Sequence, residues 1–171
     1  MGRISWDRYF MKIAGDVAER STCLRHKIGA VIVSPEHHTI VATGYNGNPR
    51  GMNHCEDIGC IRDKEDLPSG VKSEVCTAVH AEQNALMHAG MGSWGGTMYC
   101  NIQPCNTCAK MIANGGIKRV VYNQAYPDKR GLNLLVELGI EVMCLDEGCE
   151  KNGQPEPVKT PKTKKGRKGG A

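Results

Sequence analysis

The sequence is poor in aromatic residues and has no long apolar run. Phe, Trp and Tyr make up 5% of the 171 residues, with a single Phe. No stretch of about 18 consecutive apolar residues occurs, which argues against a membrane span. The opening segment, MGRISWDRYFMKIAG, lacks the apolar stretch and the small-residue cleavage site of a secretory signal. The sequence therefore predicts a cytoplasmic protein that makes no membrane contact.

Net positive charge is almost absent from the body of the chain, although the net charge of the whole chain is +4. From Pro155 onward the chain carries six of its 22 basic residues and one of its 18 acidic residues, so the remainder is close to neutral. A neutral body argues against a specific nucleic-acid partner. We expect a domain over residues 1–150 and a disordered tail over residues 151–171. The tail is interpreted as a solvated segment, with a tether for a polyanion as the alternative.

Cysteine, in contrast, is abundant, with nine residues. An odd number without a secretory signal argues against a disulfide framework, because thiols stay reduced in the cytosol. The cysteines therefore indicate metal binding.

The spacing of apolar residues changes along the chain. It predicts a helix over residues 6–20, a β-hairpin from strands 28–33 and 39–44, and an insertion without periodicity over residues 45–79. Helices then alternate with strands, with helices at 80–90, 105–116 and 129–139 and strands at 97–102, 118–123 and 140–145. Such alternation indicates crossover connections and a parallel second half of the sheet. The fold class predicted is α/β, a three-layer α/β/α sandwich around a five-stranded mixed sheet.

Four residues in two short motifs carry the predicted chemistry, namely His80, Glu82, Cys105 and Cys108. One His and two Cys are a ligand set for catalytic zinc, which leaves the fourth tetrahedral position to water. The two cysteines, three residues apart, share one face of a first helical turn, where the helix N-terminus stabilises thiolates. Glu82 is placed to move protons to and from a zinc-activated water. The alternative is a closed structural zinc with four ligands and no chemistry.

The pattern H-x-E…P-C-x-x-C is the signature of zinc-dependent nucleobase deaminases. Four segments extend the match, namely STCLRHKIGAVIV (21–33), TGYNGNPRG (43–51), HAEQNAL (80–86) and PCNTCAKMIANGGIKRVVY (104–122). Over most of residues 5–145 the chain resembles the deoxycytidylate (dCMP) deaminase family. The resemblance implies a cytidine-deaminase-like fold and hydrolysis of dCMP to dUMP and ammonia, which supplies dUMP for dTMP synthesis.

The resemblance also implies substrate-binding residues. Asn46 is expected to contact the deoxyribose or the base, and Tyr126 to approach the substrate. Arg25 and Lys27 are expected to meet the 5′-phosphate, for which a guanidinium is well shaped. The alternative for Arg25 and Lys27 is that they are ordinary loop cations.

Four further cysteines lie outside the catalytic motifs, namely Cys23, Cys55, Cys60 and Cys76. A second, structural zinc would fold the 45–79 insertion, because metal binding can supply folding free energy. Some relatives in the family bind a second zinc in this region, with Cys23 and Cys55 at matching positions. Buried or free thiols are the alternative.

Regulation is a further implication of the resemblance. The family is typically homo-oligomeric, commonly hexameric, activated by dCTP with Mg²⁺ and inhibited by dTTP. The effector site is expected around residues 44–57, with contacts from Asn48, Arg50, Glu56 and Asp57. Two other functions stay open at this point. One is a zinc-dependent polynucleotide cytosine deaminase, and the other is a non-enzymatic, zinc-stabilised nucleotide-binding module.

Overall fold

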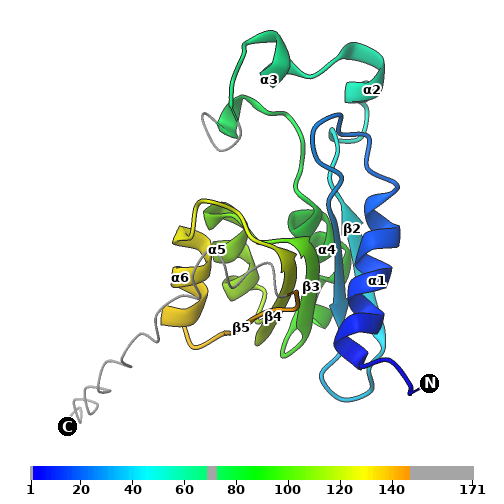
Figure 1. Ribbon diagram of the computed structural model, residues 1–171, viewed down its shortest axis with the longest axis vertical. Coiled ribbons are helices and arrows are strands. Elements are labelled where there is room, and N and C mark those ends of the chain that lie inside the picture. Colours follow the sequence, from blue (N-terminus) through cyan, green and yellow to red (C-terminus); the bar gives the residue numbers. More distant parts are fainter. Residues whose placement is uncertain (1, 69–72, 147–171) are drawn as a thin grey trace, which may run out of the picture.

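A five-stranded mixed sheet with helices on both faces forms the centre of the molecule (Figure 1). The computed structural model describes residues 2–68 and 73–146, so the predicted disorder of the 151–171 tail lies outside the described residues. The elements are α1 (Trp6–Ala18), β1 (Gly29–Val33), β2 (Ile40–Tyr45), α2 (Cys55–Ile58), α3 (Ile61–Lys64), η1 (Ser73–Val75), α4 (Ala81–Ala89), η2 (Gly90–Ser93), β3 (Thr97–Ile102), α5 (Asn106–Asn114), β4 (Arg119–Gln124), α6 (Arg130–Glu137) and β5 (Glu141–Cys144).

The strands are ordered β2-β1-β3-β4-β5. Strand β1 is antiparallel to both β2 and β3, whereas β3, β4 and β5 run parallel. The predicted hairpin and the predicted parallel half are both confirmed. The parallel strands end at one edge of the sheet, which is where open α/β sheets place their ligands.

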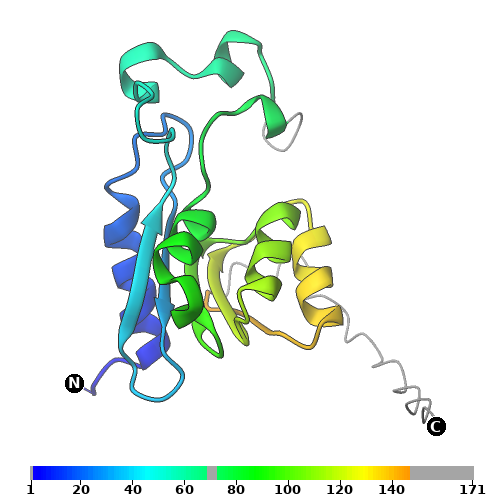
Figure 2. The ribbon, with the colours of Figure 1, turned by 180° about the vertical axis from the view of Figure 1, so that it is seen from behind.

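Alternate residues of the central strands enter two different cores. In β1, Ala30 and Ile32 pack into a cluster with α4, α5 and α6, whereas Val31 and Val33 pack with α1. All five residues of β1 are buried, as expected for a strand covered on both faces. Figure 2 shows the face covered by α4, α5 and α6, with α1 on the opposite side. The predicted three-layer α/β/α arrangement and five-stranded mixed sheet are confirmed.

A glycine on β2 lets helix α4 lie directly on the sheet. A Cβ at Gly44 would lie 2.3 Å from both Ala81 O and Ala85 N, so β2 and α4 are in backbone contact. The close approach brings the first turn of α4 against the hairpin. The position of His80, immediately before that turn, therefore depends on a glycine in a distant strand.

The insertion contains more regular structure than its sequence indicated. Helices α2, α3 and η1 lie in a segment that projects beyond the end of the sheet (Figure 1). Helix α2 begins with a capping box, in which the His54 backbone N–H donates to Asp57 Oδ2 at 3.2 Å. Four-residue helices are too short to show a 3.6-residue period, so the spacing of apolar residues did not predict α2 and α3. Within the described residues, no helix is both long and apolar enough to cross a membrane.

Candidate active site

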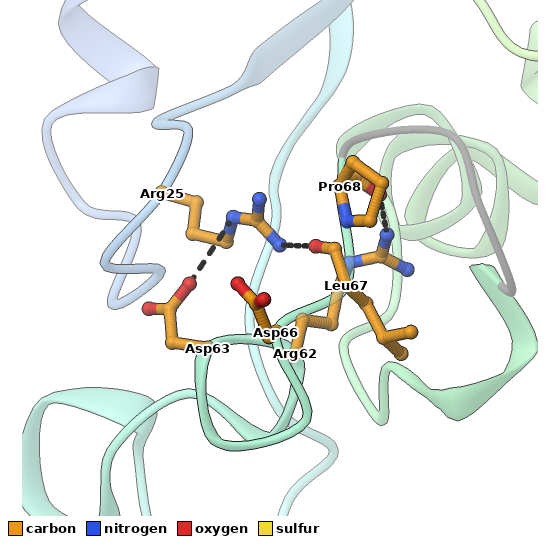
Figure 3. Close-up of a pocket in the computed structure, with 6 residues that line it drawn as sticks. All are labelled: Arg25, Arg62, Asp63, Asp66, Leu67 and Pro68. Atoms are coloured by element: carbon orange, nitrogen blue, oxygen red, sulfur yellow. Dashed lines mark hydrogen bonds and ion pairs between the residues drawn. The ribbon is translucent and has the colours of Figure 1, made fainter.

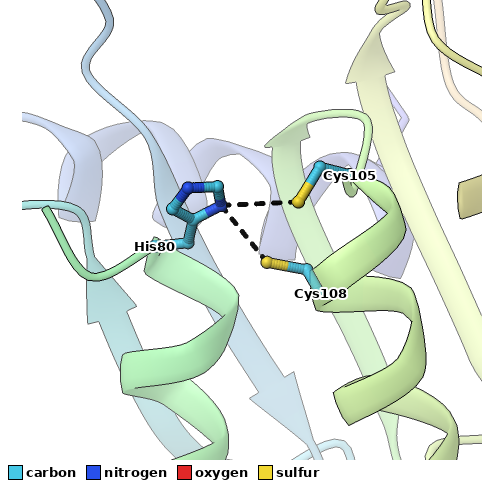
Figure 4. A group of neighbouring side chains, drawn as sticks. All are labelled: His80, Cys105 and Cys108. Atoms are coloured by element: carbon cyan, nitrogen blue, oxygen red, sulfur yellow. Dashed lines mark hydrogen bonds between the residues drawn. The ribbon is translucent and has the colours of Figure 1, made fainter. Parts of the chain in front are cut away.

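Two helix N-termini bring the three predicted metal ligands together. His80 is the N-cap of α4 and Cys105 is the N-cap of α5, with Cys108 one turn further along. The His80 Nδ1 atom lies 3.6 Å from Cys105 Sγ and 3.3 Å from Cys108 Sγ. Figure 4 shows the imidazole and both thiols pointing toward one another from the facing helix ends. The structure thus brings together His80, Cys105 and Cys108, the three residues predicted to bind the metal.

The spacing of these atoms fits zinc. All three ligand atoms lie within 4.8 Å of one another, and no other group of three His, Cys, Asp or Glu residues converges this way in the described part of the chain. Tetrahedral zinc, with bonds of about 2.3 Å to sulfur and about 2.0 Å to nitrogen, separates such ligands by about 3.5 Å. One nitrogen and two sulfurs at this spacing are therefore preorganised for zinc.

Gln83 secures the first turn of α4. The His80 backbone N–H donates to Gln83 Oε1 at 2.9 Å, and Gln83 Nε2 lies 3.5 Å from Met111 Sδ on α5. One amide thus caps the helix that carries His80 and contacts the helix that carries the two cysteines. The sequence reading did not assign Gln83 a role, although a Gln at the third position of a helix is a known capping signal.

The ligands and the predicted proton carrier have shifted pKa values. Hydrogen bonding from the Cys108 thiol lowers the pKa of Cys105 to about 4, assisted by His80, although burial opposes the shift. The hydrogen bond to Cys105 raises the pKa of His80. Glu82 is 4% exposed, and burial raises the pKa of its carboxyl. The site therefore pairs a stabilised thiolate with a buried carboxyl group that can hold a proton.

Asn46 holds the segment that precedes β1. Its side chain is nearly buried, and Oδ1 accepts hydrogen bonds from Ser21 Oγ at 2.6 Å and from the Ile28 N–H at 2.9 Å. Its Nδ2 donates to His26 O at 2.9 Å. The structure thus gives Asn46 a scaffolding role, and its contact with the sugar or the base stays a prediction.

Asn101, on β3, holds the same segment from the other side. Its Oδ1 accepts from the Gly29 N–H and its Nδ2 donates to Lys27 O, both at 3.0 Å. The Lys27 side chain is half-exposed, with its ammonium 4.0 Å from the Glu19 carboxylate. Two asparagine amides therefore fix the backbone beneath Lys27. Asn101 could not be predicted from the sequence, because an Asn inside a strand belongs to no recognisable motif.

Arg25 contacts the insertion. Its Nη1 donates to Leu67 O at 2.8 Å, and its Nε lies 3.5 Å from Asp63 Oδ1 (Figure 3). These groups line a pocket of about 510 Å³, together with Arg62, Asp66 and Pro68. The contact with the 5′-phosphate predicted for Arg25 stays a prediction.

Tyr126 lies in the loop between β4 and α6. Its backbone N–H donates to Gln103 Oε1 at 3.1 Å, and Gln103 directly precedes Pro104 and Cys105. The loop is therefore attached to the turn that carries the metal ligands, as a substrate-contacting loop would need to be.

The four additional cysteines lie near one another. Burial raises the pKa of Cys55, with further contributions from the charges of Cys23, Cys60 and Cys76. Cys55 and Cys60 are buried, whereas Cys23 and Cys76 are half-buried. In the described residues, however, their sulfurs do not gather within the 4.8 Å spacing that His80, Cys105 and Cys108 reach. Binding of a second metal stays a prediction.

The predicted effector residues divide into two pairs. Asn48 Nδ2 donates to Asn53 O at 2.7 Å, and its Oδ1 accepts from Thr77 Oγ1 at 2.8 Å, which joins the two ends of the insertion. Asp57 caps α2. The side chains of Arg50 and Glu56 are exposed. Their contact with a nucleotide effector stays a prediction.

Comparison with known proteins gives consistent matches. The deoxycytidylate deaminase of Schizosaccharomyces pombe is 40% identical over 143 residues, which are 82% of this chain and 44% of the relative. The Saccharomyces cerevisiae enzyme is 41% identical, with 82% and 45% covered. The chain thus spans less than half the length of these two relatives. The deoxycytidylate deaminase of Mycobacterium phage D29 is 41% identical over 128 residues, 71% of this chain and 97% of the relative.

Solved structures agree with the sequence matches. The dCMP deaminase of cyanophage S-TIM5, solved in complex with dCMP and dUMP, has a TM-score of 0.68 and 30% identity, and the match covers 85% of this chain and 100% of that one. The family model of the cytidine and deoxycytidylate deaminase zinc-binding region matches residues 4–124, which include His80, Glu82, Cys105 and Cys108. The chain therefore belongs to the cytidine and deoxycytidylate deaminase family.

Proposed function

We propose that the chain hydrolyses dCMP to dUMP and ammonia. The observation that carries this proposal is the convergence of His80, Cys105 and Cys108 at two helix N-termini, with Glu82 buried in the first turn of α4. The names of the relatives support the choice of substrate, since the matching proteins of both yeasts and of the mycobacteriophage are named deoxycytidylate deaminases.

The proposed mechanism divides the chemistry between the metal and the carboxyl group. His80, Cys105 and Cys108 would hold a zinc ion, which would supply Lewis acidity and acidify the attacking water. Glu82 accepts a proton from the attacking water and delivers it to the cytosine ring nitrogen, and a second transfer protonates the departing amino group. A bond from oxygen to C4 forms, the bond from C4 to the amino nitrogen breaks, and ammonia leaves. Burial raises the pKa of Glu82, which favours its uptake of a proton from the water.

The substrate is recognised, in this proposal, by three loops around the metal ligands. Asn46 and Tyr126 contact the nucleoside, and Arg25 and Lys27 contact the 5′-phosphate, which distinguishes dCMP from deoxycytidine. Arg25→Ala is expected to raise KM for dCMP far more than KM for deoxycytidine. Equal losses on the two substrates would show that Arg25 does not recognise the phosphate.

The proposed reaction is tested by ammonia release from dCMP, deoxycytidine, CMP and single-stranded DNA. We expect turnover of dCMP. Deamination of DNA without deamination of dCMP would instead assign the chain to the polynucleotide deaminases. Full zinc occupancy without turnover of any of the four substrates would favour a nucleotide-binding module.

Regulation by nucleotides is part of the proposal. We expect a homohexamer that dCTP with Mg²⁺ activates and dTTP inhibits, with effector contacts from Asn48, Arg50, Glu56 and Asp57. Such control would match the supply of dUMP for dTMP synthesis to demand. The measurement is the initial rate against dCMP concentration with and without each triphosphate. A hyperbolic curve that neither triphosphate changes would contradict the regulatory part and leave the deamination in place.

A second, structural zinc held by Cys23, Cys55, Cys60 and Cys76 completes the proposal. Burial raises the pKa of Cys55, and the nearby Cys23, Cys60 and Cys76 raise it further, so the proximity of the four thiols supports this part of the proposal. Elemental analysis of the purified protein is expected to give two zinc ions per chain, falling to one in Cys55→Ser. Cys100→Ser is the matched control, since Cys100 lies in the core beneath α4 and α5. One zinc in the unmodified protein would contradict the second site.

A further inference from the structure

Gln103 occupies a buried position between β3 and the turn that carries the metal ligands. It follows Ile102 at the end of β3 and precedes Pro104 and Cys105, and only 4% of its surface is exposed. Its backbone N–H donates to Gln124 O at 2.9 Å, where β4 ends. The side chain therefore starts from a fixed backbone position next to the loop that leaves β4.

Both ends of the Gln103 amide bind this loop. The Oε1 atom accepts from the Tyr126 N–H at 3.1 Å, and Nε2 donates to Asp128 O at 2.8 Å. A planar amide that binds two backbone groups two residues apart fixes the orientation of the loop as well as its distance. Asn46 and Asn101 bind backbone pairs with the same spacing around the start of β1, at 26 and 28 and at 27 and 29.

The far end of the loop touches the same turn. A Cβ at Gly131, in the first turn of α6, would lie 2.6 Å from Pro104 O and 3.0 Å from Cys105 O. Backbone contact at Gly131 and side-chain contact at Gln103 thus attach the 125–130 segment to the metal-ligand turn at both ends. Displacement of the loop would require breaking both part-buried hydrogen bonds of the Gln103 amide, which would leave the buried Gln103 amide unpaired at a cost in free energy.

We propose that Gln103 is a positioning residue that places the β4–α6 loop, with Tyr126, against the metal-ligand turn and thereby sets the affinity for the nucleotide. Gln103 touches neither substrate nor metal in this proposal. Its action is on the Tyr126 backbone, and its kinetic consequence depends on the deamination proposed above.

Hydrogen exchange of the Tyr126 amide tests the contact without reference to activity. Gln103→Met removes both hydrogen bonds at nearly constant side-chain length, and Gln124→Met makes the same change at an exposed position on the paired strand. Exchange at Tyr126 is expected to accelerate about tenfold in Gln103→Met, which corresponds to the loss of about 1.4 kcal/mol of protection. Equal exchange in Gln103→Met and in the unmodified protein would overturn the proposal.

Steady-state kinetics test the consequence for the substrate. Gln103→Met is expected to raise KM for dCMP about tenfold, with zinc content unchanged and kcat within about threefold. Tyr126→Ala combined with Gln103→Met should raise KM little further, because Tyr126 is already displaced in Gln103→Met. The assignment would be contradicted if the separate increases in KM multiplied in the double variant. A fall in kcat with loss of zinc in Gln103→Met would also contradict it.

Two further results keep the test decisive. If Gln103→Met does not fold, Gln103→Asn has the same amide on a side chain one methylene shorter, and the same changes in exchange and KM are expected. If the unmodified protein releases no ammonia from dCMP, the proposed function fails, whereas the exchange experiment still decides whether Gln103 holds the loop.

Discussion

At the scale of single residues, Glu82 combines deep burial with a proposed role that requires it to carry charge. Burial raises the pKa of its carboxyl, and the charge of His80 acts in the opposite direction. A carboxylate in this position is a base only above its own pKa. We therefore expect kcat/KM to fall as the pH drops through the raised pKa of Glu82.

Glu82→Gln removes the ionisable group and keeps the shape of the side chain. We expect kcat for dCMP to fall by about 10²–10⁴, as is typical when a general acid–base group is lost, while zinc is retained. Glu137→Gln, an exposed change on α6, serves as the control. The measurements are initial rates and the zinc content of each variant. Loss of zinc together with activity would mean that Glu82 supports the metal site and does not transfer protons.

Asp7 illustrates a residue that contributes stability through charge. Arg119 donates to both of its carboxylate oxygens, at 2.7 and 3.0 Å, and Tyr99 donates to one of them at 2.8 Å. Hydrogen bonding from Arg119 lowers the pKa of Asp7 below its usual value. Since the folded-state pKa is the lower one, the stabilisation is complete above the unfolded pKa and is lost as pH falls through the folded pKa.

Asp7→Asn is therefore expected to lower the free energy of unfolding by about 1 kcal/mol at pH 7. The difference from the unmodified protein should shrink as the pH falls below about 4, the unfolded pKa, and through the lowered folded-state pKa, because protonation of Asp7 removes its charge. Urea unfolding at pH 7 and over a series of acidic pH values measures both differences. Asp16→Asn, at an exposed position of the same helix, should show neither effect. A difference that does not change with pH would contradict the charge-based account.

At the scale of elements, the contacts between helices and sheet depend on glycines at defined places. Gly44 lets β2 touch α4, and Gly29 lets β1 touch α1, where a Cβ would lie 2.1 Å from Ala14 O. Gly15, in the middle of α1, has nothing within 4 Å of the Cβ position. The same residue type thus has opposite effects at different positions.

Gly44→Ala and Gly15→Ala are expected to change stability in opposite directions. Gly44→Ala should destabilise the fold by about 1–3 kcal/mol or more, because the added methyl group meets backbone atoms that cannot rotate away. Gly15→Ala should stabilise it by about 0.5–1 kcal/mol, the usual gain for an unobstructed helix interior. Thermal unfolding of both variants provides the measurement. A stabilised Gly44→Ala would show that the contact between β2 and α4 is looser than the geometry indicates.

At the scale of the whole molecule, the metal site joins the two elements that carry its ligands. His80 begins α4 and Cys105 begins α5, and both helices pack into the same core cluster on one face of the sheet. Bound zinc would therefore stabilise an arrangement that this cluster already favours. Phe10, Val31 and Tyr99 form a separate cluster on the other face, so α1 does not depend directly on the metal.

Removal of zinc by a chelator is expected to lower Tm and to leave the far-UV circular dichroism at low temperature largely unchanged. Ligand that binds only the native state stabilises it by mass action, by about 4 kcal/mol at a thousandfold excess over Kd. Cys108→Ser should lower Tm similarly and abolish most of the further effect of the chelator. An unchanged Tm in the chelated protein would contradict metal binding by the protein.

Much of the site could be predicted from the sequence because its signal is local. His80 and Glu82 lie two residues apart, Cys105 and Cys108 lie one helical turn apart, and such spacings are set by chain geometry alone. The sheet could be predicted in the same way, since hydrophobic alternation, turn residues and crossover lengths leave few topologies open. Predicted element bounds agreed with the structure within two residues over most of the chain, for example 6–20 against Trp6–Ala18.

The residues that hold the loops could not be predicted in this way. Asn101 and Gln103 bind backbone groups more than 20 residues away, and such a partner is decided by which loops the folded sheet brings to its edge. The helices α2 and α3 were missed for a related reason, since four residues are too few to display a period. The sequence by itself thus determined the metal-ligand set, because that set depends on residue type and local spacing. Only the tertiary structure decided which loops surround these ligands, because the contacts that hold the loops join residues far apart in the sequence at no fixed spacing.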